Sequence, residues 1–146
     1  MSLPVEPSVQ IDSEDKGLAI SDHFIIRDGQ EYSGAHLLID LWGASSLTDI
    51  AFIEATLKKC IDVCGATLLH IHLHQFSDSG GISGVAILAE SHISLHTWPE
   101  RDYAAFDVFM CGQTQPMLAV DVLEQAFKPD KLRVKEILRG STEGPQ

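Results

Sequence analysis

The residues best suited to chemistry are concentrated between Gly81 and Gly112. This stretch reads GISGVAILAESHISLHTWPERDYAAFDVFMCG and holds serine, histidine, tryptophan, carboxylate and cysteine side chains within one region of expected β-strand. Such side chains serve as metal ligands, as nucleophiles and as proton carriers. Their types alone do not choose among these roles, so their spacing must be considered.

The spacing argues against two common kinds of site. His92 and His96 are four residues apart, and on a strand this separates them by about 13 Å, too far to ligate one metal ion together. The stretch has no G-x-S-x-G nucleophile motif. A nucleophilic pair of Cys111 with a histidine remains open, because no distinctive spacing marks it.

A second group of histidines lies on the expected strand Thr67–Phe76, whose sequence TLLHIHLHQF alternates as a strand with two different faces does. The histidines share one face and the apolar residues share the other: His70, His72 and His74 against Leu69, Ile71 and Leu73. Alternate strand residues can ligate a metal, but a polar or subunit-facing surface explains this face more simply. We therefore predict no metal site.

The elements that must position these residues begin with a strand and a helix, continue with a run of strands, and end with a second helix and a last strand. The expected strands are Ala35–Trp42, Thr67–Phe76, Val85–Ala89, His92–His96, Ala104–Cys111 and Leu132–Leu138, and the second helix is Pro116–Phe127. Only two helices interrupt the strands, and short links join the middle strands. This order favours an α+β two-layer sandwich, with a mostly antiparallel sheet and both helices on one face.

The first helix is expected between Ser46 and Gly65. Its apolar residues recur at spacings of three and four, which makes one apolar face: Ile50, Ile53, Leu57, Ile61 and Cys64. Ser46 with Asp49 resembles a capping box at the start, and Gly65 is a natural stop. Cys60 and Cys64, four residues apart, fit helix packing.

The compact domain is expected to span residues 34–140. Residues 1–33 are predicted to be a partly disordered N-terminal extension, because residues 1–17 are rich in Pro, Ser, Asp and Glu and a turn-rich link, DGQEYSG, follows a short apolar run at Phe24–Ile26. Residues 141–146 are predicted to be a short tail.

Composition bounds the class of protein. The chain has 146 residues, a net charge of -11, 45% hydrophobic and 21% charged residues, which is ordinary for one globular domain. The acidic balance argues against binding to nucleic acids or anionic membranes. The N-terminal sequence has no secretory signal pattern and no apolar stretch is long enough to cross a bilayer, so the cytoplasm is the expected location.

The run G-x-S-G-V-x-x-x-x-E-S-H-x-x-x-H-T-W-P-E, followed by Y-A-A-x-D-x-F-x-C-G, resembles the short prokaryotic S-adenosylmethionine decarboxylases. Further matches are GAHLLIDLWGA at Gly34–Ala44, GAT at Gly65–Thr67, HQF at His74–Phe76 and FKPDKLRVKEILRG near the end. The resemblance covers roughly Gly34 to Gly140. It departs from the usual pattern at Arg101-Asp102 and at Met110.

This resemblance implies a proenzyme that cuts itself between Glu90 and Ser91. Ser91 would attack the carbonyl of Glu90, and elimination would convert Ser91 into a pyruvoyl group, the covalent cofactor. Ser83 and His96 match the family's processing residues: Ser83 would donate to the oxyanion and His96 would handle the proton. Cys111 matches the proton donor that acts during decarboxylation.

The resemblance also implies the substrate and the assembly. Phe76 and Trp98 match positions around the nucleoside of S-adenosylmethionine, and Glu100 can accept hydrogen bonds from the ribose hydroxyls. The product would be the aminopropyl donor for spermidine synthesis. Similar enzymes pair two protomers sheet to sheet, which predicts a homodimer with an α/β/β/α arrangement.

Two alternatives remain open at this point. Relatives with this scaffold can act on basic amino acids, so arginine or ornithine is a second possible substrate, and the acid at Arg101-Asp102 would suit a guanidinium or ammonium group. The other alternative is a catalytically inactive homologue that regulates a partner. The presence of Ser91, Ser83, His96 and Cys111 argues against it.

Overall fold

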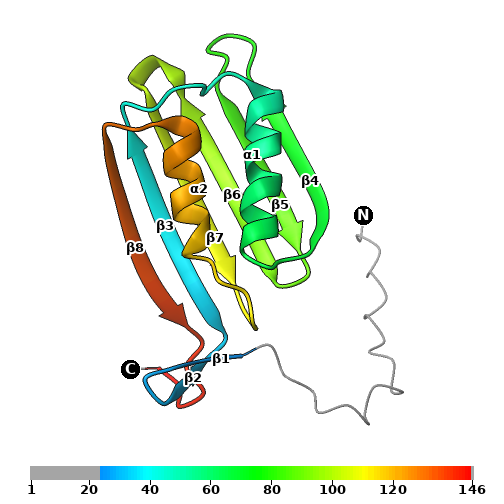
Figure 1. Ribbon diagram of the computed structural model, residues 1–146, viewed down its shortest axis with the longest axis vertical. Helices are drawn as coiled ribbons and strands as arrows, with labels where there is room; N and C mark the ends of the chain where they lie inside the picture. Colours follow the sequence, from blue (N-terminus) through cyan, green and yellow to red (C-terminus); the bar gives the residue numbers. More distant parts are fainter. Residues whose placement is uncertain (1–23, 146) are drawn as a thin grey trace, which may run out of the picture.

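The computed structural model describes residues 24–145 and shows two helices packed on one face of a six-stranded sheet (Figure 1). The strands of this sheet are β3 (Gly34–Trp42), β4 (Leu68–Gln75), β5 (Ile82–Leu88), β6 (Ser91–Trp98), β7 (Tyr103–Met110) and β8 (Lys131–Arg139). The helices are α1 (Ile50–Val63) and α2 (Leu118–Phe127), and a short 3-10 helix, η2 (Pro99–Arg101), follows β6. No helix in this part of the chain is long and apolar enough to span a membrane.

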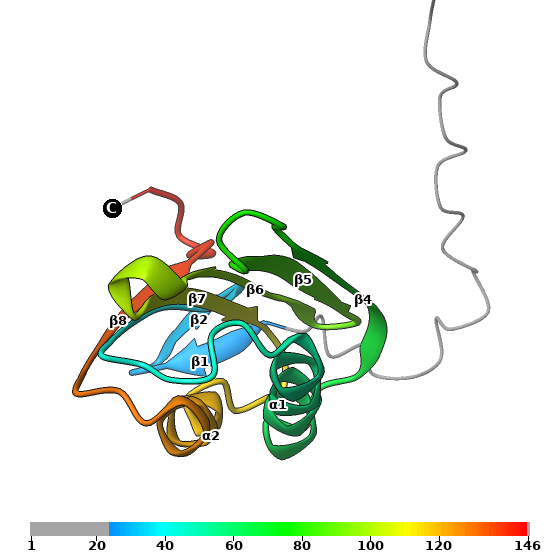
Figure 2. The same ribbon diagram turned by 90° about the horizontal axis from the view of Figure 1, so that it is seen from above.

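The sheet order is β4-β5-β6-β7-β3-β8, and all neighbouring strands are antiparallel. Strand β3 is therefore inserted between β7 and β8, which come much later in the chain. Seen from above, α1 and α2 both lie against the same face of the sheet (Figure 2). The predicted α+β two-layer sandwich is confirmed.

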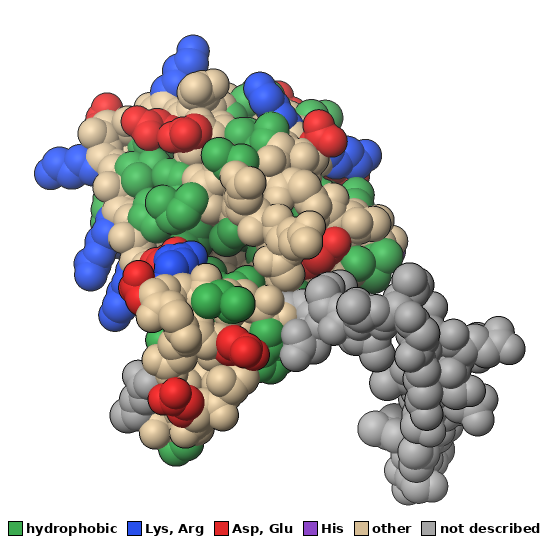
Figure 3. Space-filling view, turned by 60° about the horizontal axis from the view of Figure 1, so that its bottom comes forward, with side chains coloured by type: hydrophobic (Ala, Val, Ile, Leu, Met, Phe, Trp, Pro, Cys, Tyr) green, Lys and Arg blue, Asp and Glu red, His purple; other side chains and the backbone are tan. Residues whose placement is uncertain are grey.

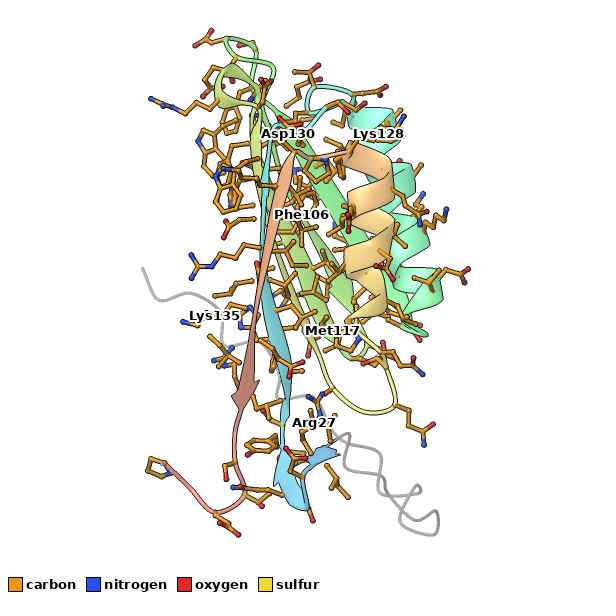
Figure 4. All side chains as sticks on the ribbon, turned by 60° about the vertical axis from the view of Figure 1, so that its left-hand side comes forward. Arg27, Phe106, Met117, Lys128, Asp130 and Lys135 are labelled. Atoms are coloured by element: carbon orange, nitrogen blue, oxygen red, sulfur yellow. The ribbon has the colours of Figure 1, made fainter. Side chains whose placement is uncertain are left out.

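The core fills the space between the helices and this face of the sheet. Its largest fully buried side chains come from both layers: Leu37, Ile39, Leu41, Ile53, Leu57, Ile82, Ile93, Leu95, Val108, Met110, Leu123 and Phe127. Alternate strand residues face the helices, as the two-residue period of a strand requires. Phe106 lies between sheet and helices, whereas Lys135 of β8 projects from the opposite side (Figure 4). We call this opposite side the open face.

The start of α1 differs from the sequence-based expectation. Asp49 is itself the N-cap, and its side chain accepts a hydrogen bond from the backbone N–H of Phe52 at 3.1 Å. Ser46 adopts a positive φ of 61° in the turn before it, so the expected capping box of Ser46 with Asp49 is wrong. Gly65 follows the helix with a φ of 75°, a conformation that glycine adopts without a steric penalty.

Strand β4 also departs from the expected alternation. The pairing with β5 shifts between Leu68 and His70, so Leu69 is the extra residue of a β-bulge and is 63% exposed. Leu68, Ile71 and Leu73 pack against the core instead. The prediction that Leu69 shares a face with Ile71 and Leu73 is wrong, because the bulge reverses the side-chain alternation at this point.

A small hairpin precedes the sheet and consists of β1 (Ile25–Arg27) and β2 (Gln30–Tyr32). It lies beside the C-terminal segment at one end of the sheet (Figure 1), and the space-filling view shows a lobe that projects from the body when this end is turned forward (Figure 3). Arg27 forms a 2.7 Å ion pair with Glu136 of β8, and the backbone N–H of Thr142 donates to the carbonyl of Glu31. The described part of the expected extension is thus an ordered hairpin, while the tail predicted over residues 1–17 lies outside the described residues.

Candidate active site

The Glu90–Ser91 bond lies at the tight turn between β5 and β6. Leu88 pairs with Ser91, so only Ala89 and Glu90 form the loop. Two-residue hairpin loops favour turns with positive φ inside the loop. Here the positive φ falls on Ser91 instead, at 147°. Residues other than glycine rarely adopt this φ, so the backbone is strained at Ser91. The peptide bond that precedes Ser91 is the expected cleavage point.

The carbonyl oxygen of Glu90 accepts two hydrogen bonds from Cys111. The thiol of Cys111 donates at 2.9 Å and its backbone N–H donates at 3.2 Å. Attack on this carbonyl by the Ser91 hydroxyl would place negative charge on the same oxygen. Two donors aimed at that atom therefore form an arrangement of the oxyanion-hole type.

The side chain of Glu90 is held from the opposite direction. Its carboxylate accepts a hydrogen bond from the backbone N–H of Thr67 at 2.8 Å and another from the Thr67 hydroxyl at 3.2 Å. Sequence reasoning gave Thr67 no role beyond a place in the GAT match. The signal was absent because the contact joins residues far apart in the chain and depends on strand register.

The other two cysteines are unlike Cys111. Cys60 and Cys64 are buried. The Cys60 thiol lies near the backbone carbonyl of Ala119 in α2, and the Cys64 thiol lies near that of Pro116, just before α2. Burial raises the pKa of Cys60 to about 12 and the pKa of Cys64 to about 11, so both stay protonated near neutral pH. Cys111 is half-buried and is the cysteine that lies at the Glu90–Ser91 turn.

Ser83 and His96 are brought together on the open face. They form a cross-strand pair between β5 and β6, and the Ser83 Oγ lies 2.8 Å from the His96 Nδ1. Along β6, however, His96 is five residues from Ser91, a separation of about 16 Å. The Ser83–His96 pair therefore does not reach the Glu90–Ser91 bond of its own chain.

The expected nucleoside-binding residues lie at the same end as the Ser83–His96 pair. The Trp98 ring is stacked on Tyr103 with centroids 5.2 Å apart, and Phe76 packs edge-on against His74 at 4.7 Å. Trp98 is 38% exposed and Phe76 is 48% exposed, so both offer an aromatic surface. Glu100 follows Trp98 in η2. We call this end of the open face the binding end, and the Glu90–Ser91–Cys111 end the cleavage end.

Asp107 organises a polar network between these two ends. Its Oδ1 lies 2.7 Å from the His36 Nε2 and 3.1 Å from the His92 Nε2, and the Ser94 hydroxyl donates to its Oδ2. The side chains of His36, His92 and Asp107 are of the types that ligate metal ions, and they lie close together. Ligands about 2.0 Å from a tetrahedral zinc stand about 3.3 Å apart. The observed contacts are shorter and satisfy the carboxylate with hydrogen bonds, so we assign a hydrogen-bonded network here.

The departure at Arg101-Asp102 has a backbone explanation. Asp102 adopts a left-handed conformation with a φ of 50°, which aspartate tolerates better than most residues. Its N–H donates to the carbonyl of Pro99 and its own carbonyl accepts from the N–H of Ala44 at 2.8 Å. The acid thus fits the turn that follows η2, without any need for a cationic substrate.

Two further aromatic residues extend the binding end. The Tyr103 hydroxyl donates to Asp40, and Trp42 lies 5.9 Å from the Tyr103 ring. Burial and the Asp40 carboxylate raise the pKa of Tyr103 to about 12. Sequence reasoning did not select these residues, because their grouping depends on the pairing of β3 with β7.

Comparison with solved structures defines the class of fold. The crystal structure of the adenosylmethionine decarboxylase from Aquifex aeolicus is similar, with a TM-score of 0.66 and 32% identity, covering 79% of this chain and 98% of that one. The family model for S-adenosylmethionine decarboxylase matches residues 35–140. The chain belongs to the S-adenosylmethionine decarboxylase family.

Sequence relatives agree with this assignment. An S-adenosylmethionine decarboxylase proenzyme of Methanococcus maripaludis is 46% identical over 110 residues, or 73% of this chain and 89% of the relative. One from Thermomicrobium roseum is 39% identical over 108 residues, or 73% of this chain and 93% of the relative. The predicted family is confirmed, and these comparisons give no support to arginine or ornithine as substrate or to an inactive homologue.

Proposed function

We propose that this chain is the proenzyme of an S-adenosylmethionine decarboxylase that cleaves itself between Glu90 and Ser91. The observation that carries the proposal is the turn at this bond, where a strained Ser91 follows a carbonyl that accepts two hydrogen bonds from Cys111. The relatives' names, which call them proenzymes, support it. The products are residues 1–90 and residues 91–146.

Self-cleavage uses the serine hydroxyl as nucleophile. The Ser91 Oγ adds to the Glu90 carbonyl carbon, the C–N bond breaks, and an ester replaces the amide. A base removes the α-proton of Ser91, and the main-chain carboxylate of Glu90 leaves as the new C-terminus of the first product. Water then converts the remaining dehydroalanine to a pyruvoyl group with release of ammonia. Cys111 stabilises the oxyanion in the first step, and relief of the strain at Ser91 favours departure from the starting geometry.

The proton-handling pair must come from a second copy. The Ser83–His96 pair is about 16 Å from Ser91 along β6, whereas proton transfer needs hydrogen-bond distance. A homodimer that packs two open faces together, with the strands in opposed directions, sets the binding end of one copy against the cleavage end of the other. His96 of the partner subunit then removes the α-proton, and Ser83 of the partner subunit adds a donor for the oxyanion.

The open face has the character of such an interface. It exposes large apolar side chains between polar groups: Leu38, Trp42, Ile87, Trp98 and Ile137. A hollow on it, lined by residues that include Asp40, Ser94 and His96, encloses only about 280 Å³. This is at the lower end of the usual size of a small-molecule site, about 300–1,000 Å³, and a second sheet packed on the open face would enclose more of a ligand. A larger cavity of about 550 Å³ lies between α1 and α2, on the far side of the sheet.

Substrate binding uses the binding end of one copy, and turnover uses the cleavage end of the other. Phe76 and Trp98 stack against the adenine and Glu100 accepts hydrogen bonds from the ribose hydroxyls. The pyruvoyl group formed from Ser91 would supply a carbonyl that can bond to the substrate amine and accept the electron pair left when carbon dioxide departs. Cys111 then protonates the substrate's α-carbon. The product is an aminopropyl donor for spermidine synthesis, and we expect this reaction in the cytoplasm.

Intact mass and a denaturing gel of the purified protein test the proposal. Two chains should appear, the smaller one blocked at its N-terminus, and Ser91→Ala should leave one chain. The cleaved protein should release carbon dioxide from S-adenosylmethionine and not from arginine or ornithine. Cleavage at Glu90 in the Ser91→Ala variant would refute the mechanism, while turnover of arginine alone would refute only the substrate.

A further inference from the structure

Thr67 contacts the cleavage turn at more than one point. It precedes β4, 23 residues before Glu90 in the sequence, and its backbone N–H and hydroxyl both donate to the Glu90 carboxylate. Its carbonyl also accepts the backbone N–H of Ala89 at 3.0 Å. Both loop residues of the turn, Ala89 and Glu90, are therefore hydrogen-bonded to Thr67, which immediately precedes β4, the strand paired with β5.

These contacts explain why strain persists at Ser91. The carbonyl end of Glu90 is fixed by the two donors of Cys111, and its side chain is fixed by the two donors of Thr67. Ser91 is itself paired with Leu88 on one side and with Met110 on the other. With both neighbours held, the turn cannot relax into a conformation that removes the positive φ of 147°. Strain of this kind lasts only where surrounding contacts over-determine it.

We propose that Thr67 is a positioning residue for self-cleavage, which acts through the Glu90 carboxylate to hold the bond before Ser91 in its strained, reactive geometry. This proposal rests on the proposed self-cleavage at Glu90–Ser91. It goes beyond it by assigning the control of the reaction's rate to a side chain that does not touch the reacting atoms. Loss of the Thr67 hydroxyl leaves the Glu90 carboxylate with one of its two donors and so weakens the restraint on the strained turn.

The test follows the cleaved fraction over time in freshly synthesised full-length protein. Thr67→Val keeps the shape and the backbone donor but removes the hydroxyl, and should slow cleavage about tenfold, the effect of one hydrogen bond to a charged acceptor. Thr67→Ser restores the hydroxyl and should cleave at close to the wild-type rate. Thr56→Val, which removes a hydroxyl bonded to the Phe52 carbonyl within α1, is the matched control and should cleave normally.

A double variant separates positioning from general damage to the fold. Glu90→Gln should slow cleavage because the amide replaces one acceptor oxygen, and combining it with Thr67→Val should be no slower than the slower single variant. The proposal would be overturned if the rate losses of the two single variants multiplied in the double variant. It would also be overturned if Thr67→Val cleaved at the wild-type rate, or if Thr67→Ser cleaved as slowly as Thr67→Val. A wild-type chain that never cleaves would instead refute the proposed function.

Discussion

The separation of His96 from Ser91 leads to a prediction that two inactive chains can restore each other. We consider a His96→Ala chain and a Ser91→Ala chain, produced together in one cell with different tags. Neither should cleave alone, because the first lacks the base and the second lacks the nucleophile. In a mixed dimer of the proposed arrangement, Ser91 of the His96→Ala chain would face the intact Ser83–His96 pair of its partner, so one complete site would be present.

The expected yield follows from the geometry. A base about 16 Å away cannot act, and one at about 3 Å can, so each chain should depend wholly on its partner for this step. With equal amounts and random pairing in a two-fold dimer, about half of the His96→Ala chains have a Ser91→Ala partner. About half of the His96→Ala chains should therefore be cut, and none of the Ser91→Ala chains.

The assay is a denaturing gel with tag detection, supported by intact mass and by light scattering for the dimer. The matched control replaces the partner with a chain that carries both Ser91→Ala and His96→Ala, which should restore nothing. Normal self-cleavage by the His96→Ala chain alone would refute a role for His96. No cleavage in mixed dimers that are shown to co-purify would refute the division of the site between subunits.

Three other outcomes are expected. Cys111→Ala should cleave more slowly than the wild type, because only the backbone N–H of residue 111 still donates to the Glu90 carbonyl oxygen. Its cleaved form should lose most decarboxylation activity, measured as carbon dioxide released per pyruvoyl group. Full activity would show that Cys111 has no role in the site. Phe76→Ala and Glu100→Gln should raise the KM for S-adenosylmethionine and leave self-cleavage intact, whereas an unchanged KM would argue against nucleoside binding there. Phe127→Ala in the Ser91→Ala background should lower the free energy of unfolding by about 3–5 kcal/mol in a urea titration, because this fully buried ring packs against Phe52 and Phe106.

The layers of the fold could be predicted because periodicity reports burial. The spacing of Ile53, Leu57 and Ile61 defined the buried face of α1, and all three are buried. Local exceptions could not be predicted in the same way. The bulge at Leu69 adds one residue with no marker in the sequence, and the cap at Asp49 depends on where the chain turns into the helix.

The candidate site could be predicted only as a set of residues. The motif identified Ser83, Ser91, His96 and Cys111 without their distances. Which of them meet depends on register: the pairing of β5 with β6 joins Ser83 to His96, and the end of β7 brings Cys111 to Glu90. For the same reason the roles of Thr67 and Asp107 were not visible before the strands were aligned.

The position of β3 in the sheet has a consequence for the two products of the proposed cleavage. Residues 1–90 contain β3, β4 and β5, and residues 91–146 contain β6, β7 and β8. Because β3 lies between β7 and β8, three of the five strand pairings join the two products: β5 with β6, β7 with β3, and β3 with β8.

The single chain can assemble this interleaved sheet as a unimolecular reaction. After the cut, the same sheet can form again only when two separate polypeptides meet, so refolding becomes second order in protein concentration. The products should stay together in native buffer and yet recover poorly after denaturation and dilution, whereas the uncut Ser91→Ala chain should refold at a rate that does not depend on concentration. Self-cleavage would thus make the mature protein kinetically stable: its native state would persist because it unfolds slowly, and not because the separated products reassemble readily.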